Sequence, residues 1–308
     1  MVVSSAPPEV LSRIEFATLP ENGPEPAIQG IKAALHKMLA SLHATPAALR
    51  AIGISCGSPM DRSTGVIQAP PNLSTWIEVP IVDILTREFA CPVGLENDAN
   101  AGAIAEHRFG AGQNTHNMLF LTFGTGLGAG IIINDQLYAG TSNMAGEIGH
   151  VRLTRGGPVG CNKAGSAEGW ASGAGMAQIA ERILSAAQRN GDHSSLFQML
   201  ADRRLTARDV GLAAQSGDAL AKRVVKTCGQ KLGLALAILV DVLNPECIVI
   251  GGLASRLGDL ILEPARESLR KEALKSSVQA CRVVPAQLGE RIGDVAALCI
   301  AMDASSDG

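Results

Sequence analysis

The stretch FLTFGTGLGAGIIINDQLYAG, from Phe120 to Gly140, is the part of this sequence that most constrains the fold. Apolar runs typical of buried β-strands flank glycines at 124, 126, 128 and 130. A glycine inside a strand costs roughly 0.5–1 kcal/mol relative to alanine, so the cluster needs a physical reason. A turn without side chains exposes backbone N–H groups, which can bind an anion such as phosphate. The alternative is a glycine-rich β-hairpin with bulges and no ligand.

The composition is that of a globular protein rather than a disordered one. The chain has 308 residues, of which 46% are hydrophobic and 18% charged, which is enough for two domains with a sizeable core. Its 26 basic and 29 acidic residues give a net charge of −3, with no broad basic excess to attract nucleic acid or an anionic membrane. Aromatic residues make up only 3%, which argues against stacking on nucleobases. We therefore expect no nucleic-acid partner and no membrane association.

The cysteines and the first residues favour a cytoplasmic protein. Seven cysteines, an odd number without a CxxC pair, are typical of a reduced compartment. The opening residues, MVVSSAPPEV, lack the basic start and the apolar core of a signal peptide. The most apolar helical run, LGLALAILVDVL, is too short to span a bilayer and carries Asp241.

Strands and helices alternate along the chain, which predicts an α/β protein. Residues 117–140 are expected to form an antiparallel meander, and Asn244-Pro245 to end a long helix. The segment FGAGQNTHN, near residue 110, looks like a linker between two sheet-forming halves. The other expected strands are 10–19, 50–56, 91–98, 247–252 and 281–288, and the expected helices are 27–42, 79–90, 99–110, several within 171–243, 257–274 and 293–304.

Polar residues follow the buried strand that ends in Glu96, Asn97 and Asp98. In an open α/β sheet, ligands bind outside the carboxyl ends of the strands. Asp98 is therefore a candidate catalytic base, and the simpler interpretation is that it caps the helix that follows. Because Asn97 or Asn100 could supply the same cap, Asp98 is not required for that structural role.

Three further segments carry polar or glycine residues in suggestive places. In AGEIGHVRL, Glu147 and His150 could bind sugar hydroxyls, or they could be a solvated carboxylate and a core histidine. In GCNKAGSAEGWASGAG, Glu168 could be a further sugar ligand or a carboxylate that favours a helix start. In CIVIGGLAS, Gly251 and Gly252 could lie against a nucleotide or simply form a tight turn.

The order of these segments, together with QAPPNLSTWIEVPI, ENDANAGAIAE and NPECIVIGGLAS, resembles the ROK family of sugar kinases and sugar-responsive repressors. The resemblance extends from about residue 10 to the end of the chain. It implies an actin-like, hexokinase-like (ribonuclease H-like) α/β fold of two domains around a central cleft. The implied domains are residues 1–109, completed by the C-terminal helix at 290–308, and residues 110–289.

The resemblance also implies the chemistry, which is ATP-dependent phosphorylation of a hexose hydroxyl in the manner of a glucokinase. ATP and Mg²⁺ would be needed, the hexose would be the partner, and a homodimer is expected. A sugar-binding or regulatory relative with impaired catalysis is the alternative. The implied roles are Asp98 as general base; Asn97, Glu147, His150 and Glu168 as sugar ligands; Gly124, Thr125 and Gly126 as a phosphate loop; and Gly251 and Gly252 as the adenosine-side turn.

The sequence departs from the family pattern in two places. The family's zinc site uses the histidine of the GH step and three cysteines, whereas VGCNKAGS keeps only Cys161, with Val159 and Ser166 at the other places. Because one thiolate and one imidazole cannot complete a tetrahedral site, we predict no zinc. The sequence also has no DxGGTK motif, which supplies the family's first phosphate loop, so we expect the first domain to be truncated at its first strand. Either the start of the chain is mis-set or part of the ATP site has been lost, and the intact second loop and sugar-site residues favour a mis-set start.

Overall fold

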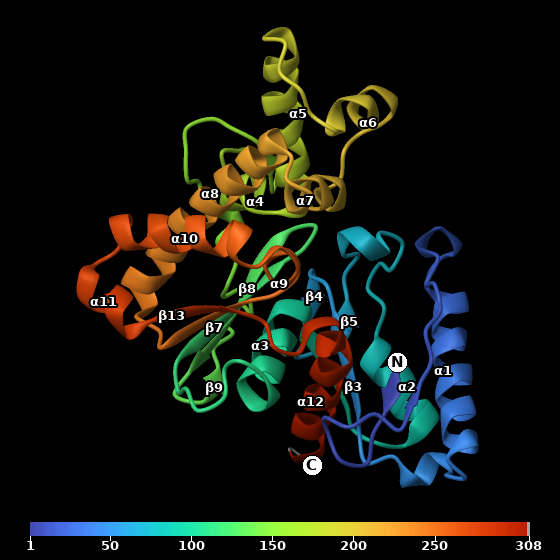
Figure 1. The fold of residues 1–308 in the computed structure, drawn as a ribbon. Helices are drawn as coiled ribbons and strands as arrows, with labels where there is room; N and C mark the ends of the chain where they lie inside the picture. The colour runs from blue at the N-terminus through green and yellow to red at the C-terminus, as the bar shows by residue number, and fades with distance from the viewer. Residues whose placement is uncertain (307–308) are drawn as a thin grey trace.

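The computed structural model describes residues 1–306, which form two parts joined by a few chain crossings (Figure 1). The larger part is built on a five-stranded sheet with the order β13-β12-β7-β8-β9. Strands β7 and β12 are almost entirely buried, as expected from their largely apolar sequences, and Thr122 is the one half-buried residue of β7. The bounds are β7 Met118–Phe123, β8 Leu127–Ile133, β9 Gln136–Leu137, β12 Cys247–Ile250 and β13 Arg282–Pro285.

The predicted meander is confirmed, because β7, β8 and β9 pair antiparallel in chain order. Strands β12 and β13 join it in parallel, so that the carboxyl ends of β7 and β12 lie next to each other. The predicted mixed α/β class is confirmed as well. The helices of this part are α4 Ala167–Trp170, α5 Gly173–Arg189, α6 Leu196–Asp202, α7 Ala207–Gln215, α8 Ala219–Leu243, α9 Leu253–Leu257, α10 Asp259–Glu272 and α11 Lys275–Ala280.

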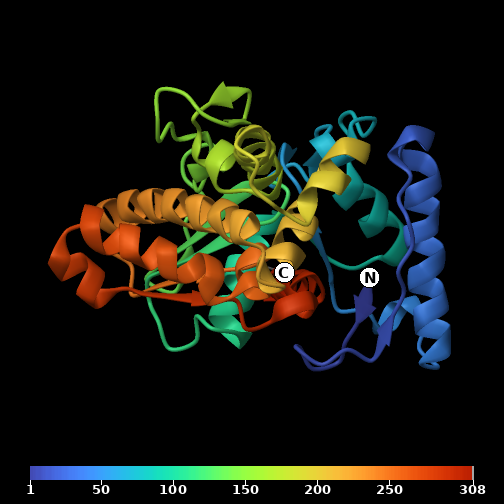
Figure 2. The ribbon, with the colours of Figure 1, turned by 45° about the horizontal axis from the view of Figure 1, so that its top comes forward.

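Helix α8 is the longest helix of the described residues and runs beside α10 through the middle of this part (Figures 1 and 2). It ends at Leu243, and Asn244 follows in the left-handed conformation with φ 46°. The predicted stop at Asn244-Pro245 is therefore confirmed. None of the helices in residues 1–306 is both long enough and apolar enough to cross a lipid bilayer.

The smaller part is built around a parallel pair, β3 (Ile52–Cys56) and β6 (Val93–Asn97). Helix α12 (Ile292–Ser306) lies against this pair, although it comes from the far end of the chain (Figure 1). Gly53 permits this contact, since a Cβ there would overlap the carbonyl oxygen of Ala297 in α12. The other elements of this part are β1 Val2–Val3, β2 Ser12–Arg13, β4 Met60–Asp61, β5 Val66–Ile67, α1 Pro24–Ser41 and α2 Ile81–Phe89. Helix α3 (Asp98–Phe109) follows β6 and packs on β7 and β8, and the short strands β10 (Val159–Gly160) and β11 (Lys163–Ala164) lie beside α4 in the larger part.

Two expectations for the smaller part are wrong. The strand expected at 10–19 is only the two-residue β2. The residues after β2 do not pair with a strand, because they lie against α1, where the Phe16 ring packs on Gly30. The segment 57–76, where no strand is expected from the sequence, contains a short hairpin, β4–β5, whose turn is closed by Asp61. The side chain of Asp61 accepts from the backbone N–H and the hydroxyl of Ser63.

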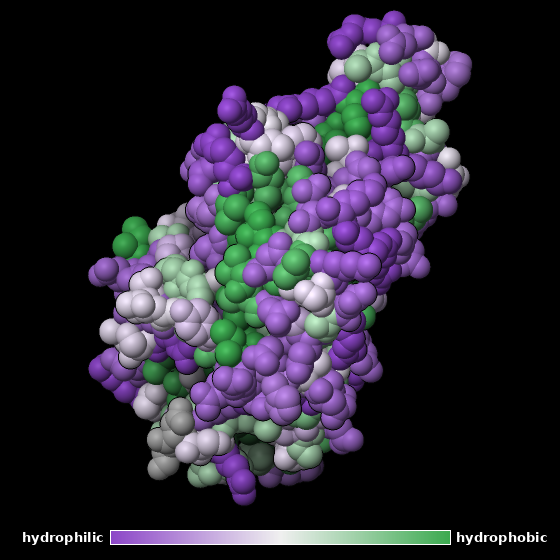
Figure 3. Space-filling view, turned by 90° about the vertical axis from the view of Figure 1, so that its left-hand side faces the viewer, coloured by the Kyte–Doolittle hydropathy of each residue, from purple (hydrophilic) through white to green (hydrophobic). Residues whose placement is uncertain are grey.

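Apolar residues gather in a strip on the face seen from the left of Figure 1 (Figure 3). Among the exposed large apolar side chains, Val242 at the end of α8 is 74% exposed and Leu274, between α10 and α11, is 64% exposed. Such side chains are costly to leave in water, so this face is a candidate contact surface.

Candidate active site

Asp98 stands at the first position of α3, directly after β6. Asn97 is the residue that caps this helix, because its Oδ1 accepts from the backbone N–H of Ala99 at 2.9 Å and of Asn100 at 3.4 Å. Asp98 is thus free of the structural role that the simpler interpretation gave it. Asp98 is exposed at the surface, but the protein atoms around its carboxylate desolvate it enough to raise its pKa.

Beside this corner lies a cavity of about 500 Å³ that both parts of the molecule line. Ser58, Pro59 and Pro71 come from the smaller part, and Met144, Glu147 and His150 from the larger. Ser58 connects the cavity wall to the corner, since its Oγ accepts from Nδ2 of Asn97 at 2.7 Å. Across the cavity, Oε2 of Glu147 lies 3.7 Å from Nε2 of His150. The fold thereby brings Glu147 and His150 together and links their cavity to Asn97.

The glycines of the β7–β8 turn and of β8 itself are required for different physical reasons. Gly130 is needed for packing, because a Cβ there would overlap the carbonyl oxygen of Ala99 in α3. Gly126 makes room for Glu168, whose Oε2 would lie 2.6 Å from a Cβ at that position. Only Gly124 faces open space, with no atom within 4 Å of a Cβ placed there. The sequence suggested that the whole glycine cluster leaves room for phosphate. In the structure, only the tip of the turn at Gly124 offers that open space.

The tip of this turn is held in place through its carbonyl groups. The carbonyl oxygen of Gly124 accepts from the backbone N–H of Gly173 at 2.7 Å, and that of Thr125 from Ala174 at 3.3 Å. Both donors belong to the first turn of α5. Gly124 and Thr125 are exposed, so the turn is a fixed, bare surface that an anion can approach.

Gly251 and Gly252 lie directly beside this turn. Gly251 donates its backbone N–H to the carbonyl oxygen of Leu121 in β7. Gly252 has φ 61°, and a Cβ there would overlap the carbonyl oxygen of Phe123. The ends of neighbouring strands β7 and β12 therefore form one glycine-lined surface, at the kind of place where α/β sheets bind ligands.

Comparison with known proteins agrees with this geometry. The model of the ROK family matches residues 5–304. The chain is 36% identical over 290 residues to a glucokinase of Halalkalibacterium halodurans, covering 92% of this chain and 86% of the relative. The chain belongs to the ROK family. A glucokinase of Thermotoga maritima is 32% identical, covering 95% of this chain and 90% of the relative.

Solved ROK structures share the fold. The chain superposes with a TM-score of 0.78 and 32% identity on a ROK family glucokinase from Streptomyces griseus, in complex with glucose and AMPPNP, covering 96% of this chain and 93% of that one. The actin-like, hexokinase-like fold is therefore confirmed. The family also contains regulators: a xylose repressor of Caldicellulosiruptor bescii is 30% identical over 84% of this chain, which spans 63% of the repressor.

Glu168, in this ROK chain, joins two segments that lie apart in the sequence. Its Oε2 accepts from the backbone N–H of Leu127, next to the bare turn, at 3.2 Å. Its Oε1 accepts from the backbone N–H of Cys161 at 2.9 Å and from the thiol of Cys161, whose sulfur lies 3.3 Å away. A carboxylate offers about four acceptor positions, so one is left for a ligand.

Cys161 is held as a protonated thiol. Burial and the neighbouring Glu168 carboxylate raise its pKa to about 12. At the other places of the family's zinc cysteines, Val159 is apolar and Ser166 donates its hydroxyl to the carbonyl oxygen of Gly160 at 2.8 Å. These residues do not fit a structural zinc site, which requires four N or S ligands, commonly deprotonated thiolates.

Protein contacts hold the loop of residues 154–166, which the family's zinc would otherwise hold. The indole N–H of Trp170 donates to Oγ1 of Thr154 at 2.7 Å, and the Trp170 ring packs on Gly157. Gln178 bonds both backbone groups of Val159 at 2.8 Å each. The ammonium of Lys231 lies 5.0 Å from the centre of the Trp170 ring.

Sequence reasoning missed two contributors to this site. Arg62 places Nη1 2.8 Å from Oε2 of Glu96, which is buried, and Ser58 bonds Asn97 as described. The signal for Glu96 was present, since it is a carboxylate in an otherwise buried strand. Nothing in the sequence pattern pointed to Arg62, which lies in the β4–β5 hairpin, or to Ser58, which lies just before it, because no strand was expected in that segment.

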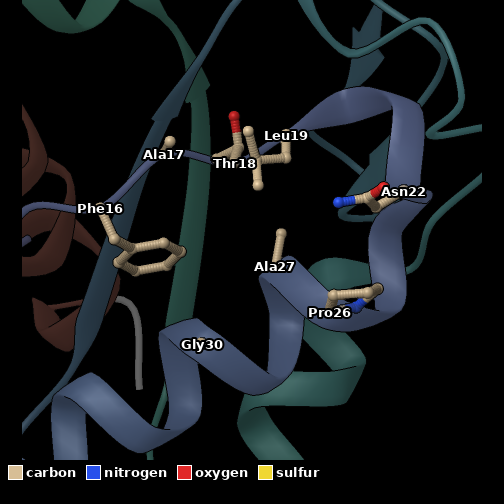
Figure 4. Close-up of a pocket in the computed structure, with 8 residues that line it drawn as sticks. All are labelled: Phe16, Ala17, Thr18, Leu19, Asn22, Pro26, Ala27 and Gly30. Atoms are coloured by element: carbon tan, nitrogen blue, oxygen red, sulfur yellow. The ribbon is translucent and has the colours of Figure 1, made fainter.

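A second cavity, of about 180 Å³, lies between α1 and the segment that precedes it (Figure 4). None of its lining side chains can ionise, so it offers no group for acid–base chemistry. We therefore place the active site at the first cavity. The lining residues are Phe16, Ala17, Thr18, Leu19, Asn22, Pro26, Ala27 and Gly30.

Proposed function

We propose that this ROK chain transfers the γ-phosphate of ATP to a hydroxyl of a hexose, with Asp98 as the general base. The observation that carries the proposal is the position of Asp98. Asp98 is not the cap of α3, its carboxylate has a raised pKa, and it directly follows β6. The last residue of β6, Asn97, bonds Ser58 in the cavity wall. The glucose and AMPPNP bound by the Streptomyces griseus relative support hexose and ATP as the substrate pair.

In this mechanism, Asp98 accepts the proton of the attacking hydroxyl at a carboxylate oxygen, about 2.6–3.2 Å away. Glu147 and His150 hold the ring hydroxyls from the opposite wall, because a carboxylate accepts two hydroxyl protons and an imidazole can donate or accept. Asn97 and Glu168 each have one bonding position left for the same ring. Phosphoryl transfer depends mainly on such positioning and on charge stabilisation.

The bare tip at Gly124, Thr125 and Gly126 would receive the phosphates, and Gly251 with Gly252 would lie against the nucleoside side. When bound, Mg²⁺ would supply positive charge that stabilises the phosphoryl transfer. We propose that zinc has no place in this chain, because Cys161 bonds Glu168 as a thiol and Ser166 is bonded to its own loop.

We propose the domain division 1–109 with 290–308 against 110–289, supported by the packing of α12 on β3 and β6. A homodimer is also proposed, supported by the exposed apolar side chains at Val242 and Leu274. No nucleic-acid partner is proposed, on the charge balance of the whole chain.

The second candidate function is sugar-dependent regulation without phosphorylation, which the similarity to a xylose repressor favours. An ADP-release assay with MgATP over glucose, mannose, fructose, allose and N-acetylmannosamine separates the two. The kinase proposal predicts ADP release that depends on hexose and is greatest with glucose. The variant Glu147→Gln should raise the KM for the hexose by about tenfold or more, since hydrogen bonds to a charged group contribute about 1.5–3 kcal/mol. A hexose that raises the thermal midpoint without any ADP release would support the regulator instead.

A further inference from the structure

An ion pair between the buried Glu96 and the partly exposed Arg62 lies next to the proposed base and takes no part in the steps above. Glu96, the residue before Asn97, has a side chain only 4% exposed, and its Oε2 lies 2.8 Å from Nη1 of Arg62. Arg62 belongs to the turn of the β4–β5 hairpin, in the same segment as Ser58 and Pro59 of the cavity wall. The pair therefore connects the wall of the cavity to the strand that leads to Asp98.

The second oxygen of Glu96 fixes the residues on both sides of Asp98. Oε1 accepts from the backbone N–H of Asn97 at 2.9 Å and from Nδ2 of Asn100, also at 2.9 Å. Asn97 is the helix cap and Asn100 is buried. Through this one carboxylate, the hairpin, the cap and the first turn of α3 form a single hydrogen-bonded unit around an otherwise unpaired Asp98.

Such a pair is an expensive way to stabilise a fold. Removing the Glu96 charge from water costs on the order of several kcal/mol, and a well-packed apolar residue often stabilises a fold as much or more. What the pair adds is a directional link between two surfaces of the cavity.

We propose that Arg62 and Glu96 are positioning residues for the phosphoryl transfer, which hold the Asp98 corner in register with the cavity wall. This inference rests on the proposed kinase function. Neither residue touches a reacting atom. Their effect is carried by Ser58, Asn97 and Asn100, and a displacement of about 1 Å in such a corner can cost on the order of 100-fold in rate.

Four proteins test the proposal: the wild type, Arg62→Met, Arg62→Lys and the control Arg87→Met. Arg87 is a matched control, since it lies in the same part of the molecule, pairs with Asp83 at 3.9 Å and is 83% exposed. The first measurement is amide hydrogen exchange, which needs no substrate. Arg62→Met should exchange about tenfold faster or more over residues 95–101, whereas Arg62→Lys and Arg87→Met should match the wild type.

The second measurement is steady-state kinetics with the best hexose. Arg62→Met should lower kcat about tenfold or more while the KM for ATP stays within about twofold, because the phosphate turn is untouched. Arg62→Lys, which keeps the charge, should recover kcat to within about threefold of the wild type. A general loss of folding would raise exchange throughout the chain and would not produce this separation of kcat from KM.

The outcomes are distinct. Unchanged exchange at 95–101 in Arg62→Met would show that the pair does not hold the corner and would overturn the inference. Faster exchange with an unchanged kcat would overturn its catalytic part. If the wild type phosphorylates no hexose, the proposed function fails and the catalytic part of the inference fails with it, while the exchange data still decide whether the pair holds the corner.

Discussion

At the scale of single residues, Asp98 shows what the fold does to one carboxyl group. Asn97 takes over the capping of α3, which leaves the Asp98 carboxylate without a structural partner among the side chains of the described residues. Desolvation then raises its pKa above the ordinary 3.8. A carboxylate that is desolvated without serving a structural role, as at Asp98, is typical of functional sites.

This shift predicts a pH-dependent effect on stability. Because the pKa of Asp98 is higher in the folded than in the unfolded chain, the folded state binds the proton more tightly, and stability is lost as pH rises through the folded pKa. Asp98→Asn does not titrate, so it should be more stable than the wild type at pH 7. The difference should shrink as the pH falls toward about 4. Urea unfolding of both proteins at several pH values measures it, and a constant difference would contradict the shift.

The glycines of the turn give a second prediction at this scale. Gly124→Ala places a methyl group in open space, so the protein should keep its stability but bind ATP about tenfold or more weakly, because the methyl group blocks phosphate. Gly130→Ala forces a methyl group against α3 and should cost about 1–3 kcal/mol of unfolding free energy. Thermal unfolding and the KM for ATP separate the two effects. Unchanged ATP binding in Gly124→Ala would refute the phosphate role of the tip.

At the scale of elements, the loop of residues 154–166 is held by side chains rather than by ligation. Trp170, Gln178 and Lys231 come from three different helices and all act on this loop or on the ring that covers it. The indole N–H of Trp170 donates directly to the Thr154 hydroxyl in this loop. The contact of Gln178 with Val159 could not be predicted from the sequence, because it depends on where α5 runs relative to the loop.

Elemental analysis and chelation test this description of the loop. The purified protein should contain well under one zinc per chain, and EDTA should leave its thermal midpoint unchanged. Trp170→Phe should lose about 1 kcal/mol through its missing hydrogen bond and speed amide exchange over residues 154–166. Trp76→Phe is a suitable control, since the buried Trp76 indole N–H has no partner in the described residues. Stoichiometric zinc, or unfolding by the chelator, would contradict this description.

The elements with strong periodic patterns could be predicted from the sequence, and the weak ones could not. The meander at 117–140 and the end of α8 follow from local signals, namely alternating apolar runs and an Asn-Pro stop. The expected strand at 10–19 failed because a tertiary contact, Phe16 over Gly30, competes with pairing. The β4–β5 hairpin was missed because each of its strands is two residues long. The Arg62–Glu96 ion pair could not be predicted either, because Arg62 lies in the turn of this hairpin.

At the scale of the whole molecule, the candidate site depends on two parts that meet at one cavity. Asp98 and Ser58 belong to the smaller part, whereas Glu147, His150 and the bare turn belong to the larger. Helix α12 returns from the end of the chain to pack on β3 and β6, so the chain crosses between the parts more than once (Figure 1). This arrangement allows the parts to close on a substrate and exclude water, which would otherwise compete as the acceptor.

The most direct test of the central claim is the kcat for hexose phosphorylation in the wild type and in Asp98→Asn, measured with saturating MgATP at neutral pH. General-base catalysis contributes about 10²–10⁴-fold, so Asp98→Asn should lose at least about 100-fold in kcat while its hexose affinity, measured by calorimetry, stays within about threefold. Activity in Asp98→Asn within a few-fold of the wild type would contradict the assignment of Asp98 as the base.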